Sequence, residues 1–154
     1  VIPGGSSVPV MTPEEVSKAT MDYESIQEVS GSYLGSGGMI VMDDTTDMVS
    51  ALSNLLRFYA HESCGQCTPC REGVGWMSQI LIRLDKGDAS DDDLEILLDL
   101  ANNIHSKTIC FFGASAAMPV QSFLQKFVSV QTSWMRLETQ RRLSGKVSQS
   151  ARLL

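Results

Sequence analysis

The chain has 154 residues, of which 43% are hydrophobic and 6% aromatic, and this length suits one domain or two small modules that share an interface. The net charge is −6. Residues 128–154 hold five basic groups and one acid, a charge of +4, so the other residues together carry −10. An acidic body argues against nucleic acid as a partner, because attraction to phosphates requires a basic face.

The sequence contains no run of about 18 apolar residues, so it predicts no membrane span. The first basic residue is Lys18, so the start resembles neither a secretory leader nor an Arg-rich transit peptide. The chain begins with Val1 rather than Met, which fits processing or a missing upstream part.

The first 44 residues are rich in Gly, Ser and Pro and contain two short apolar runs, residues 8–11 and 39–42, which predict strands. The Gly-rich piece at residues 35–38 could suggest a phosphate-binding loop. It leads into a predicted strand, however, whereas phosphate loops lead from a strand into a helix. A tight turn is the better interpretation.

From Thr45 the apolar spacing becomes helical. The first helix is predicted from residues spaced three and four apart, with Thr45, Thr46 or Asp47 as its cap; its apolar positions are Met48, Ala51, Leu52, Leu55 and Tyr59. A second helix is expected over about residues 71–84, ended by Gly87.

A third helix is expected to start at Ser90, whose spacing to Asp93 resembles a capping box. A fourth is expected to open near Pro119, because proline suits the first helical turn. Four amphipathic helices with short links predict a helical bundle.

The four cysteines are Cys64, Cys67, Cys70 and Cys110. Three thiols at two-residue gaps compete for the same disulfide partner, but they can wrap one face of a cubane with each sulfur on a different iron. A remote fourth cysteine then closes the site. The spacing therefore predicts one [4Fe–4S] cluster on these four residues, acting as a relay for single electrons.

Three other interpretations of these cysteines are weaker. Structural zinc sites usually pair two Cys-x₂-Cys turns or add histidine, and here the second half is a lone cysteine. A thioredoxin-type pair requires an α/β frame and no third thiol. Radical chemistry on S-adenosylmethionine uses Cys-x₃-Cys-x₂-Cys, a spacing one residue longer, and four thiolates leave no iron open for a substrate.

Other polar residues lie close to the cysteines in sequence. His61 precedes Cys64 by three residues and could support a ligand, although a surface or helix-terminal role is favoured for both His61 and His105. Arg71 could offset the charge of a cluster or hold a partner's carboxylate, or it could form an ion pair with Glu72 at the helix start.

The stretch from His61 to Gly73 resembles the cluster loop of the flavin-bearing, NADH-oxidising subunit (51 kDa type) of respiratory complex I. Residues 2–7 and 38–43 resemble parts of that family's soluble-ligand-binding β-grasp module. Residues 108–110 and 119–121 resemble its fourth-ligand loop and the helix that follows. The match covers about residues 1–127 in unbroken order. The amino-acid sequence of the cluster loop is more similar to that of mitochondrial members than to that of bacterial ones.

The resemblance implies an α+β fold, in which a small β-grasp-like module (residues 1–45) precedes a helical [4Fe–4S] domain (residues 46–135) and a basic tail (residues 136–154). Two departures concern the last helix. Members of the family commonly have Trp where Met118 stands here, and an Arg soon after the position of Phe127, where residues 128–130 are Val-Ser-Val.

The resemblance also implies a function. In this family a flavin oxidises NADH by hydride transfer and the cluster then accepts electrons singly, on the way to quinone. The half that binds FMN and NADH has no counterpart here, so those cofactors are expected on an upstream or partner segment. Other iron–sulfur subunits of the complex are further expected partners, and membrane association is expected only through the complex. The expected location is the matrix side of the mitochondrial inner membrane, or else the cytoplasmic face of a bacterial membrane.

Two alternatives to this function stay open. One is the equivalent module of an NAD-linked hydrogenase or formate dehydrogenase. The other is a non-redox assembly module with a structural metal site.

Overall fold

The computed structural model describes residues 1–90 and 92–127, and these residues are mostly helical. Five helices are α1 (Pro13–Lys18), α2 (Tyr23–Ser30), α3 (Met48–Glu62), α4 (Thr68–Asp85) and α5 (Asp93–Ile104). A further helix covers residues 112–127. The predicted basic tail, residues 136–154, and the departure at residues 128–130 lie outside the described residues.

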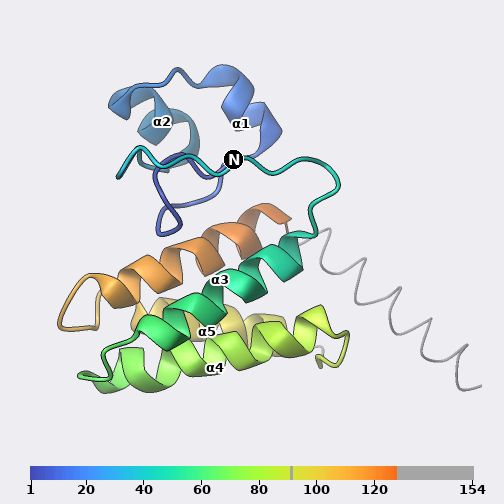
Figure 1. The fold of residues 1–154 in the computed structure, drawn as a ribbon, viewed down its shortest axis with the longest axis vertical. Helices are drawn as coiled ribbons and strands as arrows, with labels where there is room; N and C mark the ends of the chain where they lie inside the picture. The colour runs from blue at the N-terminus through green and yellow to red at the C-terminus, as the bar shows by residue number, and fades with distance from the viewer. Residues whose placement is uncertain (91, 128–154) are drawn as a thin grey trace, which may run out of the picture.

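The four predicted helices form and pack around one hydrophobic core (Figure 1). Asp47 caps α3, accepting hydrogen bonds from the N–H groups of Val49 and Ser50 at 2.8 and 3.0 Å. The core side chains come from every helix of the bundle; the largest fully buried ones include Leu52, Leu56, Met77, Leu81, Leu97 and Phe123. The amphipathic spacing was therefore sufficient to predict the bundle's existence.

Three helix starts differ from the prediction. Helix α5 begins at Asp93 rather than at Ser90, although Ser90 N–H bonds Asp93 Oδ2 at 2.7 Å. Helix α4 begins at Thr68, three residues early, because Pro69 fits its first turn and Arg71 N–H already bonds Cys67 O at 2.9 Å. The last helix begins at residue 112, seven residues before Pro119, which is fully buried within it. A run rich in alanine, including Ala114, Ala116 and Ala117, favours helix strongly enough to carry it past a proline that interrupts the bonding pattern.

The two predicted strands are wrong, since the described residues contain only an isolated antiparallel bridge between Ile2 and Ile40. These two residues exchange N–H···O bonds of 2.8 and 2.9 Å, and on the other side Met11 N–H bonds Val1 O at 2.7 Å. Proline limits the pairing on both sides, because neither Pro3 nor Pro9 has an N–H to extend a ladder. The described residues thus do not show the β-grasp sheet.

Helices α1 and α2 were not predicted. The α1 cap is a complete capping box: Thr12 N–H bonds Glu15 Oε2 at 2.8 Å and Glu15 N–H bonds Thr12 Oγ1 at 3.3 Å. Asp22 caps α2, which ends at Gly31 with a positive φ of 68°. The glycine-rich piece forms a tight turn, as expected, in which Gly37 N–H bonds Leu34 O at 2.7 Å.

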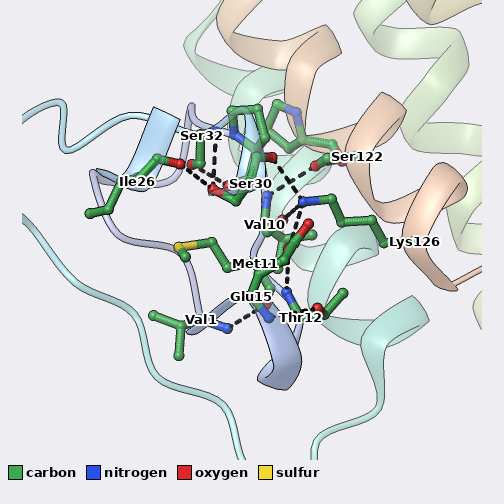
Figure 2. A network of polar contacts seen from close by, with 12 residues as sticks. Val1, Val10, Met11, Thr12, Glu15, Ile26, Ser30, Ser32, Ser122 and Lys126 are labelled. Atoms are coloured by element: carbon green, nitrogen blue, oxygen red, sulfur yellow. Dashed lines mark hydrogen bonds and ion pairs between the residues drawn. The ribbon is translucent and has the colours of Figure 1, made fainter. Parts of the chain in front are cut away.

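The N-terminal part lies against the last helix of the bundle (Figure 1). Figure 2 shows the polar contacts at this junction. Val10 N–H donates to Ser122 Oγ at 3.1 Å, and Lys126 Nζ donates to Val10 O at 2.9 Å, Glu15 Oε2 at 2.8 Å and Ser30 O at 3.1 Å. One lysine therefore joins the last helix to α1, to the end of α2 and to the segment before them.

Candidate metal centre

The segment that joins α3 to α4 and the segment that precedes the last helix lie at the same end of the bundle (Figure 1). Cys64 and Cys67 lie between α3 and α4, and Cys67 is the N-cap of α4. Cys70 is in the first turn of that helix and is 5% exposed. Cys110 lies just before the last helix and is exposed, as is Cys64, and all four thiols are free.

The loop between α3 and α4 is held from both ends. Ser63 caps the C-terminus of α3, and its Oγ lies 3.3 Å from Cys70 Sγ and accepts the N–H of Gly65 at 3.4 Å. Gly65 has φ of 72°, a left-handed conformation that favours glycine. Arg71 reaches back from α4, donating from Nη1 to Gly65 O at 3.3 Å. The loop is thus fixed to the helices on either side of it.

Electrostatics link Cys70 to the other three cysteines. Burial raises the pKa of the Cys70 thiol, and the neighbouring Cys67, Cys110 and Cys64 raise it further. The hydrogen bond from Ser63 acts in the opposite direction and lowers this pKa. The structure therefore brings Cys110, forty residues away in sequence, within electrostatic reach of the Cys70 thiol.

The loop that carries Cys110 has its own supports. Thr108 Oγ1 donates to Cys110 O at 2.8 Å, and Ser106 has a positive φ of 63°. After the cysteine, the ring of Phe112 packs edge-on against Tyr59 of α3, with centroids 5.6 Å apart. The aromatic pair joins the start of the last helix to the helix that precedes the other cysteines.

Among residues 1–90 and 92–127, no group of three or more His, Cys, Asp or Glu side chains is arranged to hold a single metal ion. Four sulfurs on one zinc ion would lie within roughly 4 Å of one another, because each Zn–S bond is about 2.3 Å long. A four-iron cluster requires a wider spacing of sulfurs, because each thiolate binds a different iron.

The four cysteines fit a [4Fe–4S] cluster in chemistry and number. Cysteine thiolates are the usual ligands of such clusters. None of the four is oxidised to a disulfide, and burial of Cys70 with its hydroxyl partner places one of them in a sheltered, hydrogen-bonded setting. These four thiols could therefore hold a cluster.

His61 is in the last turn of α3 with 86% of its side chain exposed, and its Nε2 lies 4.0 Å from Glu62 Oε1. His105 is the C-cap of α5, and its Nδ1 is buried without a hydrogen-bond partner among the described residues. Arg71 forms the expected ion pair with Glu72 at 2.9 Å in addition to holding Gly65. Met118 is half-buried in the last helix.

Sequence reasoning missed two residues that support the cysteines, Ser63 and Thr108. The hydroxyl of Ser63 follows a helix end and precedes a cysteine motif, which is a signal that could have suggested it. Nothing in the spacing of Thr108 indicates its bond to the carbonyl of Cys110.

Residues 50–132 match the family model described as "NADH-ubiquinone oxidoreductase-F iron-sulfur binding region". The F subunit of the NADH-quinone oxidoreductase of Rickettsia akari (strain Hartford) is 50% identical over 129 residues, which are 84% of this chain and 30% of that protein. The corresponding protein of Rickettsia bellii (strain OSU 85-389) is 49% identical over 127 residues, which are 82% of this chain and again 30% of that protein. The chain thus spans about 30% of the length of these curated relatives, which are bacterial and give no support for the mitochondrial location.

Among solved structures, a chain of an NAD⁺-reducing [NiFe]-hydrogenase in the air-oxidised state is similar with a TM-score of 0.74 and 29% identity. The similarity covers 86% of this chain and 22% of that chain. The H₂-reduced state of an NAD⁺-reducing [NiFe]-hydrogenase gives the same TM-score at 28% identity, over 92% of this chain and 26% of that chain.

Proposed function

The chain belongs to the family of NADH-ubiquinone oxidoreductase-F iron–sulfur binding regions, and from this premise we propose that it is the electron-transfer portion of an NADH dehydrogenase of the respiratory complex I type. Its part is to take single electrons from a flavin reduced by NADH and to pass them toward quinone. It would be a part of an oxidoreductase that is not catalytic as an isolated chain.

The proposal depends most on one observation, which is that Cys110 comes within electrostatic reach of Cys70 although forty residues separate them. Cys64, Cys67, Cys70 and Cys110 would together hold one [4Fe–4S] cluster. A cluster in such a closed site, when bound, gains and loses one electron without exchanging ligands.

The residues around the cysteines suit that task. Buried side chains of α3, α4 and the last helix exclude water from the inner side of Cys70. Ser63 and Arg71 hold the loop in one conformation, which limits its rearrangement when the charge changes. A site that rearranges little between two charge states favours rapid electron transfer.

FMN and NADH would bind on an upstream or partner segment. This chain has no Gly-rich strand-to-helix loop of the dinucleotide-binding type in its sequence. Beside Cys110, Ile109 and Phe111 are 78% and 69% exposed, which supports a partner segment that covers this loop. Other iron–sulfur subunits of the complex would be the next partners.

The division into residues 1–45, 46–135 and 136–154 is part of the same proposal, with the first part corresponding to the family's β-grasp module. Contacts of Lys126 with Val10 and Ser30 support a first part that is docked on the bundle.

A second candidate is the equivalent module of an NAD-linked hydrogenase. The similarity to the NAD⁺-reducing [NiFe]-hydrogenase, with a TM-score of 0.74, favours it. Identity of 49–50% to the NADH-quinone oxidoreductase relatives, against 29% to the hydrogenase chain, makes the NADH dehydrogenase the better proposal.

No helix among the described residues is long and apolar enough to cross a membrane. We propose that the chain associates with a membrane only peripherally, through its complex. Two locations are proposed. The bacterial origin of the curated relatives favours the cytoplasmic face of a bacterial membrane. The sequence of the cluster loop resembles mitochondrial members and favours the matrix side of the mitochondrial inner membrane.

Recombination of the purified chain with the separate flavin-binding segment of one of the NADH-quinone oxidoreductase relatives tests the function. NADH–ferricyanide activity and reduction of the cluster by NADH should both require the two parts together. Stoichiometric flavin binding by this chain alone, or activity without the flavin-binding segment, would contradict the proposal.

A further inference from the structure

Ser63 sits where the last turn of α3 meets the cysteine loop, and its hydroxyl contacts a cysteine sulfur. The Oγ atom lies 3.3 Å from Cys70 Sγ and 3.4 Å from the amide nitrogen of Gly65. Gly65 N–H donates to Oγ, so it occupies an acceptor position of the hydroxyl. The hydroxyl proton of Ser63 is then free to point toward Cys70 Sγ.

The direction of the Ser63–Cys70 bond is fixed once Cys70 binds a metal. A ligating cysteine is a thiolate with no proton to donate, so the hydroxyl must be the donor. The resulting chain runs from Gly65 N–H through Ser63 O–H to Cys70 Sγ, and successive bonds of this kind polarise and strengthen one another.

We propose that Ser63 is a positioning residue that raises the reduction potential of the cluster by donating a hydrogen bond to the sulfur of Cys70. This inference rests on the proposed function. Negative charge on the ligand sulfurs increases when a cluster takes up an electron, so a donor to sulfur stabilises the reduced form more than the oxidised form.

Other polar side chains near the cysteines direct their hydrogen bonds elsewhere. Thr108 Oγ1 donates to the backbone oxygen of Cys110, and the Arg71 guanidinium donates to Gly65 O and Glu72 Oε1. These residues hold the backbone of the loops, whereas Ser63 acts on a sulfur. Because Ser63 is half-buried beside the buried Cys70, its bond is partly shielded from competing water.

The test is a redox titration of the full chain, reconstituted anaerobically with iron and sulfide and followed by electron paramagnetic resonance. Ser63→Ala should shift the potential to more negative values, lowering the ratio of reduced to oxidised cluster at a fixed ambient potential by about tenfold. Ser63→Thr keeps the hydroxyl and should restore most of the wild-type potential. The matched control is Ser78→Ala. Ser78 is a buried serine about two turns after Cys70 in α4, and its replacement should leave the potential unchanged.

A potential in Ser63→Ala equal to that of the wild type, with the cluster intact, would overturn the inference while leaving the proposed function in place. Failure of the wild-type chain to assemble a [4Fe–4S] cluster would instead contradict the proposed function. Should Ser63→Ala lose its cluster, electron–nuclear double resonance on the reduced wild type and Ser63→Thr decides the matter. An exchangeable proton coupled to the cluster in both proteins supports the bond, and its absence from both overturns it.

Discussion

Gly113 and Thr108 approach so closely that only a glycine fits. A Cβ atom on Gly113 would lie 2.4 Å from Thr108 Cγ2 and 2.6 Å from its Oγ1. The same Oγ1 donates to Cys110 O at 2.8 Å, so the side chain of Thr108 fills the space between the last helix and the loop of the fourth cysteine. The absence of a side chain at Gly113 therefore shapes the position of Cys110.

Gly113→Ala should destabilise the folded chain by about 2 kcal/mol, because the added methyl displaces Thr108 and overpacks the loop. Chemical denaturation measures the loss, and cluster retention after reconstitution should fall with it. Gly75→Ala is the control: its Cβ meets nothing within 4 Å inside α4, so it should stabilise the chain by about 1 kcal/mol. Adding Thr108→Ala to Gly113→Ala should recover part of the loss, and the absence of any recovery would contradict the contact.

Lys126→Met should loosen the N-terminal part from the bundle and cost about 3 kcal/mol, since it leaves the partly buried Glu15 carboxylate and two carbonyl oxygens without their cation. Hydrogen exchange should accelerate most in residues 9–32, while α4 keeps its protection. Lys107→Met, at an exposed lysine whose Nζ donates to Asn103 Oδ1, is the control. Equal exchange in residues 9–32 of both variants would show that Lys126 does not join these parts.

Asp93 should make the stability fall in acid. Burial alone would raise the pKa of this carboxyl, but hydrogen bonds from Ser90 and Arg83 outweigh burial and lower the pKa below 3.8. The unfolded chain therefore takes up a proton first as the pH falls below 3.8, and stability is lost progressively until the folded-state pKa is passed. At neutral pH the full contribution is present.

Denaturant titrations from about pH 7 to about pH 2 measure this dependence. Asp93→Asn should flatten the curve below about pH 4, and Asp99→Asn, at an exposed position of the same helix, reports the effect of the substitution itself. A parent and an Asp93→Asn variant with the same acid slope would rule out the contribution of Asp93.

Much of the bundle could be predicted from residue spacing, because a helix whose apolar face repeats every three or four residues must bury that face. The N-terminal part was misread for a physical reason: the apolar run at residues 8–11 contains Pro9, which cannot donate to a strand ladder. The Thr12–Glu15 capping box was present in the sequence but was not used. Pro119 was interpreted as a helix start although it lies inside the last helix, whereas Pro69, which does lie in the first turn of α4, was not.

The candidate site was predicted at the level of its cysteines, and their ligation of a cluster stays a prediction. The hydrogen bonds that hold the cysteine loops and the N-terminal part in place were not predictable, because they depend on how the ends of different helices meet. Ser63 and Cys70 are seven residues apart and touch only because α3 and α4 turn back at this loop. The contact of Lys126 with Val10 joins residues 116 positions apart, and no local pattern indicates it.

Removal of the cluster should unfold the cysteine loops locally. A cluster bound to Cys110 and to the loop between α3 and α4 would link two loops that the chain otherwise connects only through α4 and α5. Binding of the cluster and folding of these loops are therefore coupled. Anaerobic chelation of iron should lower the melting temperature and expose residues 61–73 to protease. A digestion pattern identical in the stripped and loaded proteins would contradict this coupling.

The most direct measurement is iron and sulfide analysis of the reconstituted full chain together with electron paramagnetic resonance after reduction, on the parent and on Cys110→Ser. The parent should contain about four irons and four sulfides per chain and give the signal of one reduced [4Fe–4S] cluster. Cys110→Ser should lose or convert that cluster and show a less stable last helix. A Cys110→Ser protein with the full signal and unchanged stability would contradict ligation by the four cysteines.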